Sequence, residues 1–230
     1  MKNKLLYILI FAVLGFLLLQ LPVNTLVGTK AKLTFFDMFY PVSGAFLGTG
    51  FGFVAVFGMQ IANLAFHGFS TLNSVSILAL LATSRLVSMG AGAFAFSRCD
   101  KLALALPIFS ILIFLLNPVG RSVWYFTLLW MIPIAVFVFR KKSIFANSLF
   151  ATFSSHAVGG ALWIWAFNTT PVYWNMLIPI VILERTIFAL GISANFILLN
   201  NLLAYAEKVK VLPQSGVAIS KKYLLKFVQA

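Results

Sequence analysis

The sequence predicts an all-α protein, a polytopic helical membrane protein with about seven transmembrane helices. Of the 230 residues, 62% are hydrophobic and 9% are charged, whereas about 25% are charged in ordinary globular domains. Apolar runs of about 17–30 residues recur along the chain, and about 20 such residues cross a hydrocarbon core as a helix. We therefore expect one integral-membrane domain in contact with the lipid bilayer.

The distribution of charge supports this fold class. The chain has 17 Lys and Arg and 4 Asp and Glu, which makes 21 charged side chains. Only Arg85, Glu184 and Arg185 fall inside long apolar stretches, and the others lie at stretch edges, in connections or in the tails. A charge at the hydrocarbon midplane costs at least about 2.5–3.5 kcal/mol. The three exceptions must be compensated, so they are the first candidates for a functional role.

Seven apolar spans are predicted in order, joined by short connections. Turn-forming residues mark two connections, Asn117–Gly120 and Asn168–Pro171. Trp163 and Trp174 flank the second one, as aromatic residues do at a membrane surface. The spans lie near residues 5–22, 39–65, 75–97, 102–119, 123–139, 145–168 and 173–203, and a basic cytoplasmic tail follows over residues 207–230.

Lys and Arg residues predict the orientation. With seven spans and an external N-terminus, 12 Lys and Arg lie on the cytoplasmic side and 3 lie outside, the bias expected of a plasma or inner membrane protein. If residues 35–67 instead form a re-entrant pair or two short crossings, the N-terminus is cytoplasmic and the count is unchanged. Both topologies place the C-terminus in the cytoplasm. Lys2 and Lys4 precede the first span without a following cleavage site, so we expect an uncleaved helix.

Four ionisable residues are predicted at similar depth on three helices. Glu184 and Arg185 follow Tyr173, at the start of the last span, by about 11 residues, or about 16 Å. Arg85 lies about 15 Å and His156 about 18 Å from the same side of the membrane. We expect these four side chains to form the binding site of a small-molecule solute.

Two interpretations of this cluster remain open. In the first, Glu184 neutralises Arg85 or Arg185, and the remaining cation faces a water-filled cavity or an anionic group of a solute. In the second, a buried ion pair fixes the helix register and binds nothing. His156 is either a buried imidazole whose hydrogen bonds are made within the protein or part of the site. Gly159 and Gly160 on the same helix leave space beside it.

Glycines four residues apart follow one face of the second span. Gly44, Gly48 and Gly52 form two consecutive small-xxx-small steps, which let another backbone approach closely. The pattern indicates helix packing or a partner interface. Whether the partner helix belongs to this chain or to another subunit stays open.

Several function classes are disfavoured. The net charge of +13 is dispersed among short connections, so we expect no nucleic-acid partner. With one cysteine, Cys99, two histidines and no H-E-x-x-H pattern, we expect no metal site. The phosphate-binding pattern G-x-x-x-x-G-K-[ST] is absent as well. We therefore expect no cofactor and no enzyme, and any transport needs an energising partner.

The spans after the first resemble the substrate-binding S components of energy-coupling-factor transporters. The resemblance covers residues 33–205 and includes the small-residue segment Gly44-Ala45-Phe46-Leu47-Gly48 on the first core helix. It implies a six-helix core after an N-terminal helix, a small molecule bound near the outer side, and docking on an energising transmembrane subunit with an ATPase.

The leading hypothesis is an integral-membrane small-molecule binding or transport subunit. It would hold a polar or anionic solute at Arg85, His156, Glu184 and Arg185. One alternative is an intramembrane enzyme that acts on a lipid-linked substrate, with Glu184 and His156 as acid–base groups. Another is a non-catalytic membrane assembly protein whose glycine face is its interface.

Overall fold

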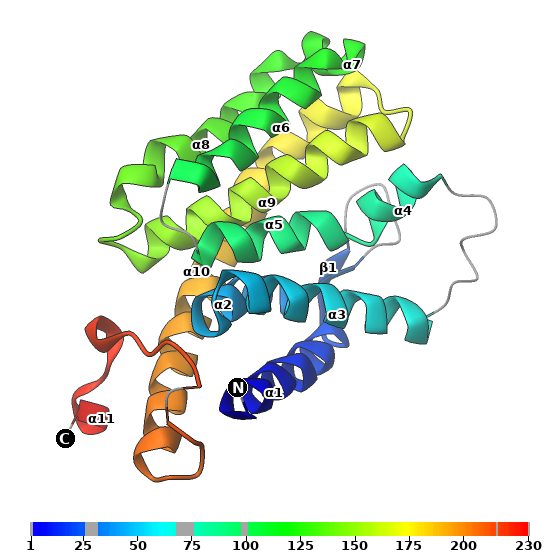
Figure 1. Cartoon of the computed structure of the whole chain (residues 1–230). Helices are drawn as coiled ribbons and strands as arrows, with labels where there is room; N and C mark the ends of the chain where they lie inside the picture. The colour runs from blue at the N-terminus through cyan, green and yellow to red at the C-terminus, as the bar shows by residue number, and fades with distance from the viewer. Residues whose placement is uncertain (1, 26–31, 68–75, 98–100, 215, 230) are drawn as a thin grey trace.

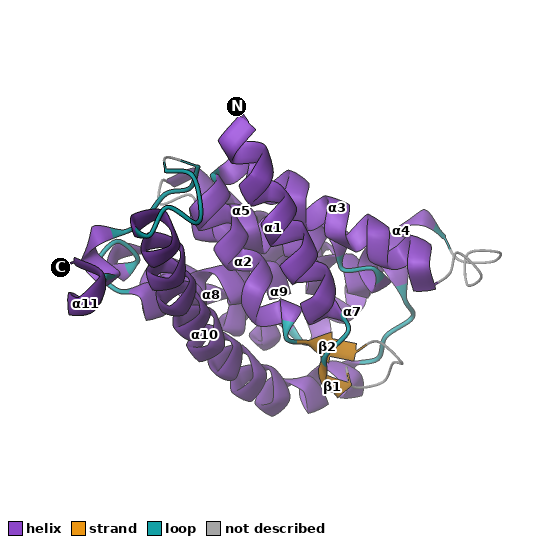
Figure 2. Cartoon of the chain, turned by 90° about the horizontal axis from the view of Figure 1, so that it is seen from below, coloured by secondary structure: helices purple, strands orange, loops and turns teal. Residues whose placement is uncertain are grey.

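The structure, a computed structural model, describes residues 2–25, 32–67, 76–97, 101–214 and 216–229, and it confirms the all-α class. The non-helical element among these residues is one short antiparallel strand pair, β1 (Pro22–Thr25) and β2 (Lys32–Thr34), which pair Pro22 with Thr34 and Thr25 with Lys32 around an irregularity (Figure 2). The helices are α1 (Lys2–Leu19), α2 (Phe36–Leu47), α3 (Thr49–His67), α4 (Ile77–Thr83), α5 (Leu86–Ser97), η2 (Lys101–Leu104), α6 (Ala105–Leu116), α7 (Pro118–Ser122), η3 (Trp124–Thr127), α8 (Leu128–Val136), η4 (Phe137–Phe139), α9 (Ile144–Ala166), α10 (Pro171–Lys208), η5 (Lys221–Tyr223) and α11 (Lys226–Gln229).

The ends of the two longest helices follow from local sequence. Ser143 caps α9 by accepting a hydrogen bond from the backbone N–H of Ala146 at 3.3 Å. Thr170 caps α10 in the same way, and Pro171 occupies the first helical turn, where its missing N–H has no cost. Both starts lie within two residues of the predicted spans.

Two apolar cores organise the molecule. The first core joins α1, α2, α3 and α5 to the C-terminal half of α10, with Phe46 stacked on Phe196. The second core joins α6, η3 and α8 to the N-terminal part of α10, with the Phe114 ring 4.9 Å from the rings of Trp130 and Trp174. Helices α9 and α10 contribute to both cores and connect them (Figure 1).

The expectation of one helix over residues 39–65 is corrected, because the chain breaks at Gly48. This glycine has a φ of 84°, a conformation that costs other residues energy. A β-carbon at residue 52 would collide with the α-carbon of Gly44. In a straight helix those residues would lie about 12 Å apart along the axis. The chain therefore folds back between α2 and α3, as in the alternative that gives residues 35–67 two segments.

The predicted helix over residues 75–97 is also broken. Helices α4 and α5 meet at a 50° bend, and Arg85, the residue before α5, has a φ of 55°. Positive φ is uncommon in residues other than glycine and often marks functional positions. The bend places Arg85 at the joint between two short helices.

The helices differ in their capacity to cross a bilayer. By length and composition, one described helix, α10, is long and apolar enough, and α4 with α5 makes a second if the bent pair counts as one span. Residues 3–19, 101–116 and 124–139 form shorter apolar helices. At about 1.5 Å per residue, the 38 residues of α10 extend about 57 Å.

The first turns of α1 lie against the end of α10 and the segment that follows it. The Asn3 amide donates a hydrogen bond to the Gln214 carbonyl at 3.2 Å, and the Tyr7 hydroxyl lies 2.8 Å from the Glu207 carboxylate. The segment predicted as a basic tail folds back along α10. There, the side chains of Asn200 and Asn201 bond the backbone of residues 220, 223 and 225. The tail is thus part of the packed structure.

Candidate functional site

A pocket with an empty volume of about 840 Å³, counting the part open to the exterior, lies where the two cores meet. Its walls come from β2, α2, α4, α5, α9 and α10. All four residues predicted from membrane depth, Arg85, His156, Glu184 and Arg185, line it. The predicted gathering of these side chains thus matches the geometry of the structure.

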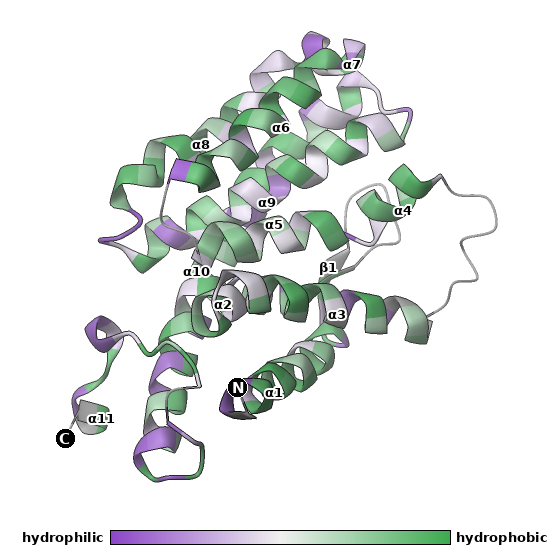
Figure 3. Ribbon diagram, in the orientation of Figure 1, coloured by the Kyte–Doolittle hydropathy of each residue, from purple (hydrophilic) through white to green (hydrophobic). Residues whose placement is uncertain are grey.

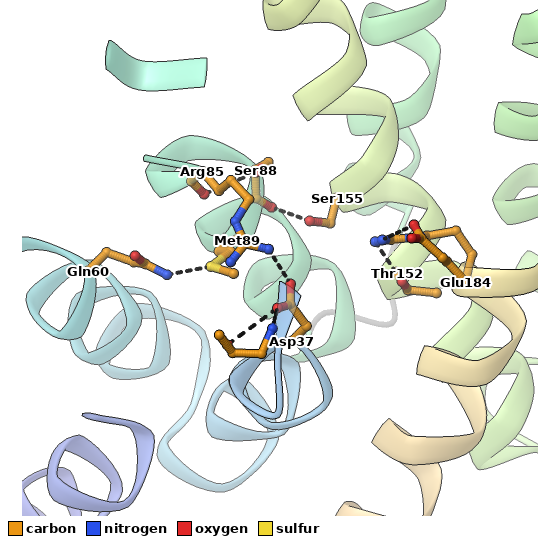
Figure 4. A network of polar contacts seen from close by, with 10 residues as sticks. Asp37, Gln60, Arg85, Ser88, Met89, Thr152, Ser155 and Glu184 are labelled. Carbon is orange, nitrogen blue, oxygen red and sulfur yellow. Dashed lines mark hydrogen bonds and ion pairs between the residues drawn. The ribbon is translucent and has the colours of Figure 1, made fainter. Parts of the chain in front are cut away.

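The first ion pair of the pocket joins α2 to the start of α5. Arg85 Nη1 lies 2.6 Å from Asp37 Oδ1, and the two side chains are 18% and 6% exposed. The second carboxylate oxygen, Oδ2, accepts the backbone N–H of Thr34 at 2.8 Å. Both oxygens of Asp37 are therefore engaged, so this pair is well compensated for its burial. Figure 4 shows the Asp37 carboxylate facing Arg85.

Sequence reasoning missed Asp37, because the residue precedes the predicted span by two positions. The prediction that one arginine of the cluster has no carboxylate partner is therefore wrong. Asp37 pairs with Arg85, and Glu184 contacts Arg185. One local signal was available. Thr34 and Asp37 match the T-x-x-D capping pattern, in which the acidic side chain bonds the backbone N–H three residues earlier.

The second ion pair lies on α10 and is less complete. Arg185 Nη2 is 3.5 Å from Glu184 Oε2, and Arg185 Nη1 is 3.4 Å from the Thr152 hydroxyl on α9. Both contacts are at the long limit for a hydrogen bond. The guanidinium also lies 4.6 Å from the centre of the Phe188 ring. Figure 4 shows Glu184 beside Thr152, away from Asp37.

Two atoms of this second pair have no hydrogen-bond partner within the described part of the chain. They are Glu184 Oε1 and Arg185 Nε, and both are buried. The side chains are 13% and 9% exposed. Buried polar atoms are normally paired, because leaving one unpaired costs about 1–3 kcal/mol. Glu184 therefore retains one unused hydrogen-bond acceptor, and Arg185 retains one unused donor.

His156 occupies the α9 wall with a defined hydrogen bond. Its Nδ1 accepts the indole N–H of Trp130 at 3.0 Å. Because the indole only donates, Nδ1 carries no proton, so a neutral ring bears its proton on Nε2. Of the two glycines expected to leave space, Gly160 is packed against the Trp130 ring, whereas a β-carbon at Gly159 would meet only ordinary contacts. The space is thus beside Gly159.

A serine pair joins the two walls of the pocket. The Ser155 hydroxyl on α9 donates to the Ser88 carbonyl on α5 at 2.7 Å, and Figure 4 shows this bond between the two ion pairs. At the next residue of α5, the amide of Gln60 from α3 lies 2.6 Å from the Met89 sulfur. The polar side of the pocket is therefore connected across α3, α5 and α9.

The other end of the pocket is aromatic. Trp163, Tyr173 and Trp174 line it beside the connection between α9 and α10. The Trp174 indole N–H donates to the Thr169 hydroxyl at 3.0 Å, which fixes the ring. Tyr173 and Arg185 are 12 residues apart on α10, or about 18 Å. The pocket is therefore elongated, with a charged end and an aromatic end.

The predicted glycine face packs inside the chain. A β-carbon at Gly44 would collide with the Ala93 carbonyl of α5, and Gly52 lies against Gly44. Gly48 has open space around it and forms the turn. Gly44 and Gly52 therefore allow α2, α3 and α5 to approach closely, and the partner helices belong to this chain.

The arrangement is chemically suited to binding. Across the described ranges, no group of three His, Cys, Asp or Glu side chains could hold a metal ion. The lining combines apolar and aromatic side chains with a few convergent polar groups, the usual composition of a small-molecule site. No protein-family model, curated protein or solved structure matches the chain.

Proposed function

We propose that this chain is a polytopic membrane protein of the plasma or inner membrane that binds or transports a polar small molecule, in the manner of an S component. The observation that carries the proposal is the pocket between the two cores, which contains an ion pair with an unused donor and acceptor. Intramembrane ionisable residues commonly mark binding sites and transport paths. With no nucleotide-binding pattern in the sequence, transport would depend on an energising transmembrane subunit and an ATPase.

Support for the membrane location comes from the outward faces of the helices. Leu183, Leu190 and Leu198 on α10 are 63%, 57% and 63% exposed. Large apolar side chains are exposed on α1, α3, α6 and α8 as well, and Figure 3 shows hydrophobic colouring along these helices. Exposed large apolar side chains on this many helices are unfavourable in water and favourable in lipid.

For the topology, we propose that both termini are cytoplasmic. The contacts of Asn3 and Tyr7 with the end of α10 and the segment after it support a topology in which both ends of the chain lie on the same side of the membrane. The break at Gly48 supplies the extra reversal of the chain that this arrangement needs. With residues 35–67 as a re-entrant pair or two crossings, the 12-to-3 bias of Lys and Arg is retained. Reporter fusions at each end should both give cytoplasmic signals.

The function is tested by native mass spectrometry of protein purified in mild detergent from its own host. We compare the wild type with Arg185→Gln and with the control Arg121→Gln, which changes an exposed arginine on α7. A bound small molecule in the wild type and the control, absent from Arg185→Gln, supports the proposal. Wild-type protein without any bound molecule, or a molecule retained equally by all three, contradicts it.

A second candidate function has one supporting observation. His156 and Glu184 line the same pocket, as the hypothesis of an intramembrane enzyme with acid–base groups requires. An enzyme would release a chemically altered molecule, whereas a binding subunit returns its ligand unchanged. Mass analysis of the released ligand distinguishes these candidates. The assembly alternative has less support, because Gly44 and Gly52 pack inside this chain.

A further inference from the structure

We propose that the ligand of this pocket is a small zwitterion with an aromatic or other flat apolar body, of the size of an aromatic amino acid. This inference rests on the proposed binding function and specifies the ligand class. It follows from three features of the pocket: its charge balance, the unused atoms of the Glu184–Arg185 pair, and its division into a charged end and an aromatic end.

The charges that line the pocket cancel among the described residues. Asp37 and Glu184 oppose Arg85 and Arg185, and His156 is neutral in the tautomer that accepts the Trp130 N–H. A ligand with a net charge would therefore add an uncompensated charge to a site of low dielectric constant, which is unfavourable. A ligand with zero net charge avoids this cost. The expectation of an anionic ligand depended on an arginine without a carboxylate partner. Because the charges of the pocket cancel, that reason no longer holds.

The unused atoms indicate a head group with both signs of charge. Glu184 Oε1 accepts hydrogen bonds only, and Arg185 Nε donates only. A carboxylate on the ligand would satisfy the donor, and an ammonium group would satisfy the acceptor. Because the direct contact between the two side chains is long, at 3.5 Å, a small rotation can separate them around such a head group. The tight 2.6 Å pair of Asp37 and Arg85 offers no comparable opening.

The far end of the pocket defines the body of the ligand. Trp163, Tyr173 and Trp174 line this end together with Leu177 and Val181. Aromatic walls favour a flat apolar group, which stacks on them or meets their edges. Val181 and Leu177 precede Arg185 on α10 by four and eight residues, or about 6 and 12 Å along the axis, so a head group at Arg185 and a ring directed towards the aromatic end lie in line.

The test uses three probes that share a phenyl ring and differ in head-group charge. L-Phenylalanine is zwitterionic, 2-phenylethylamine is cationic and 3-phenylpropionate is anionic at neutral pH. Binding of each is measured by isothermal titration calorimetry to the full chain in lipid nanodiscs. The wild type should bind L-phenylalanine at least about tenfold more tightly than either other probe.

Two charge-neutralising variants should reverse this order in opposite directions. Glu184→Gln leaves the pocket with one excess positive charge, so 3-phenylpropionate should become the preferred probe. Arg185→Gln leaves one excess negative charge, so 2-phenylethylamine should become the preferred probe. The control Arg121→Gln, which does not line the pocket, should keep the wild-type order. If one pocket variant does not fold, the other alone still shows the reversal.

The outcomes separate the ligand class from the proposed function. A wild-type preference for the cation or the anion overturns the zwitterion, and so does an order that neither pocket variant changes. If none of the probes binds while native mass spectrometry finds a different bound molecule, the ligand class is wrong and the binding function stands. If no probe binds and no molecule is retained, both proposals fail.

Discussion

Each of the two ion pairs of the pocket joins a carboxylate to an arginine, but their environments differ. Asp37 and Arg85 are 2.6 Å apart, and the second oxygen of Asp37 is bound to the backbone N–H of Thr34. Glu184 and Arg185 are 3.5 Å apart, and each has a buried atom without a described partner. The comparison indicates that the first pair stabilises the fold, whereas the second is available for a ligand. Satisfied hydrogen bonds, more than burial alone, distinguish the two roles.

The largest expected effect follows from breaking the first pair. Asp37→Asn retains the shape of the side chain and removes its charge, so Arg85 is left largely buried without its carboxylate. Removing one partner of a buried pair typically costs about 3–5 kcal/mol, and the 18% exposure of Arg85 favours the lower value. We expect the free energy of unfolding in detergent to fall by about 3 kcal/mol. A loss below about 1 kcal/mol would place this pair among weak surface pairs.

Removing both charges of the first pair sharpens the comparison. The double variant Asp37→Asn with Arg85→Gln leaves no unpaired charge in place of the pair. Its destabilisation should be smaller than the sum of the single effects by about 1–3 kcal/mol, the range for residues in direct contact. A double-mutant cycle of unfolding free energies measures this coupling. Additive effects would show that Asp37 and Arg85 act independently.

Breaking the second pair should affect binding more than stability. Glu184→Gln removes a contact of 3.5 Å, which is long for an ion pair, so we expect a smaller loss of unfolding free energy than for Asp37→Asn, although Arg185 stays buried. Retention of the co-purified ligand should fall at least about tenfold, because the acceptor for its cationic group is lost. Both quantities are measured on one preparation. A stability loss as large as that of Asp37→Asn would assign a structural role to both pairs.

The smallest effect concerns the hydroxyl that supports Arg185. Thr152→Val removes a contact of 3.4 Å and preserves the size of the side chain. We expect a loss of about 0.5 kcal/mol in unfolding free energy, at the low end for a single hydrogen bond. Chemical denaturation of the variant beside the wild type measures this loss. A change above about 1.5 kcal/mol would indicate that Thr152 is a principal partner of the guanidinium.

The sequence predicted the helical class and the starts of the long C-terminal helices, because these depend on local signals. Ser143 and the Thr170-Pro171 pair cap α9 and α10 close to the predicted starts. A break within residues 35–67 was one of two open alternatives, without Gly48 as its position, and the break at Arg85 was not predicted. Apolar residues continue through both positions, and only the tertiary packing requires a positive φ there.

The site was predicted in part, through depth in the membrane. Counting residues from the span ends placed Arg85, His156 and Glu184 at one level, and they line one pocket. Counting depth could not predict which charged side chains pair. Asp37 and Arg85 are separated by 48 positions and meet only through the packing of α2 on α5. The capping pattern that orients Asp37 is local, but its contact with Arg85 is tertiary.

A crystal structure of the host-purified protein in a lipidic mesophase would test the central claim most directly. The account predicts electron density for a small molecule between Glu184, Arg185 and the aromatic end of the pocket, with the Asp37–Arg85 pair intact. An empty pocket with Glu184 and Arg185 closed on each other would contradict the account. A ligand bound to Arg85 in place of Asp37 would contradict it as well.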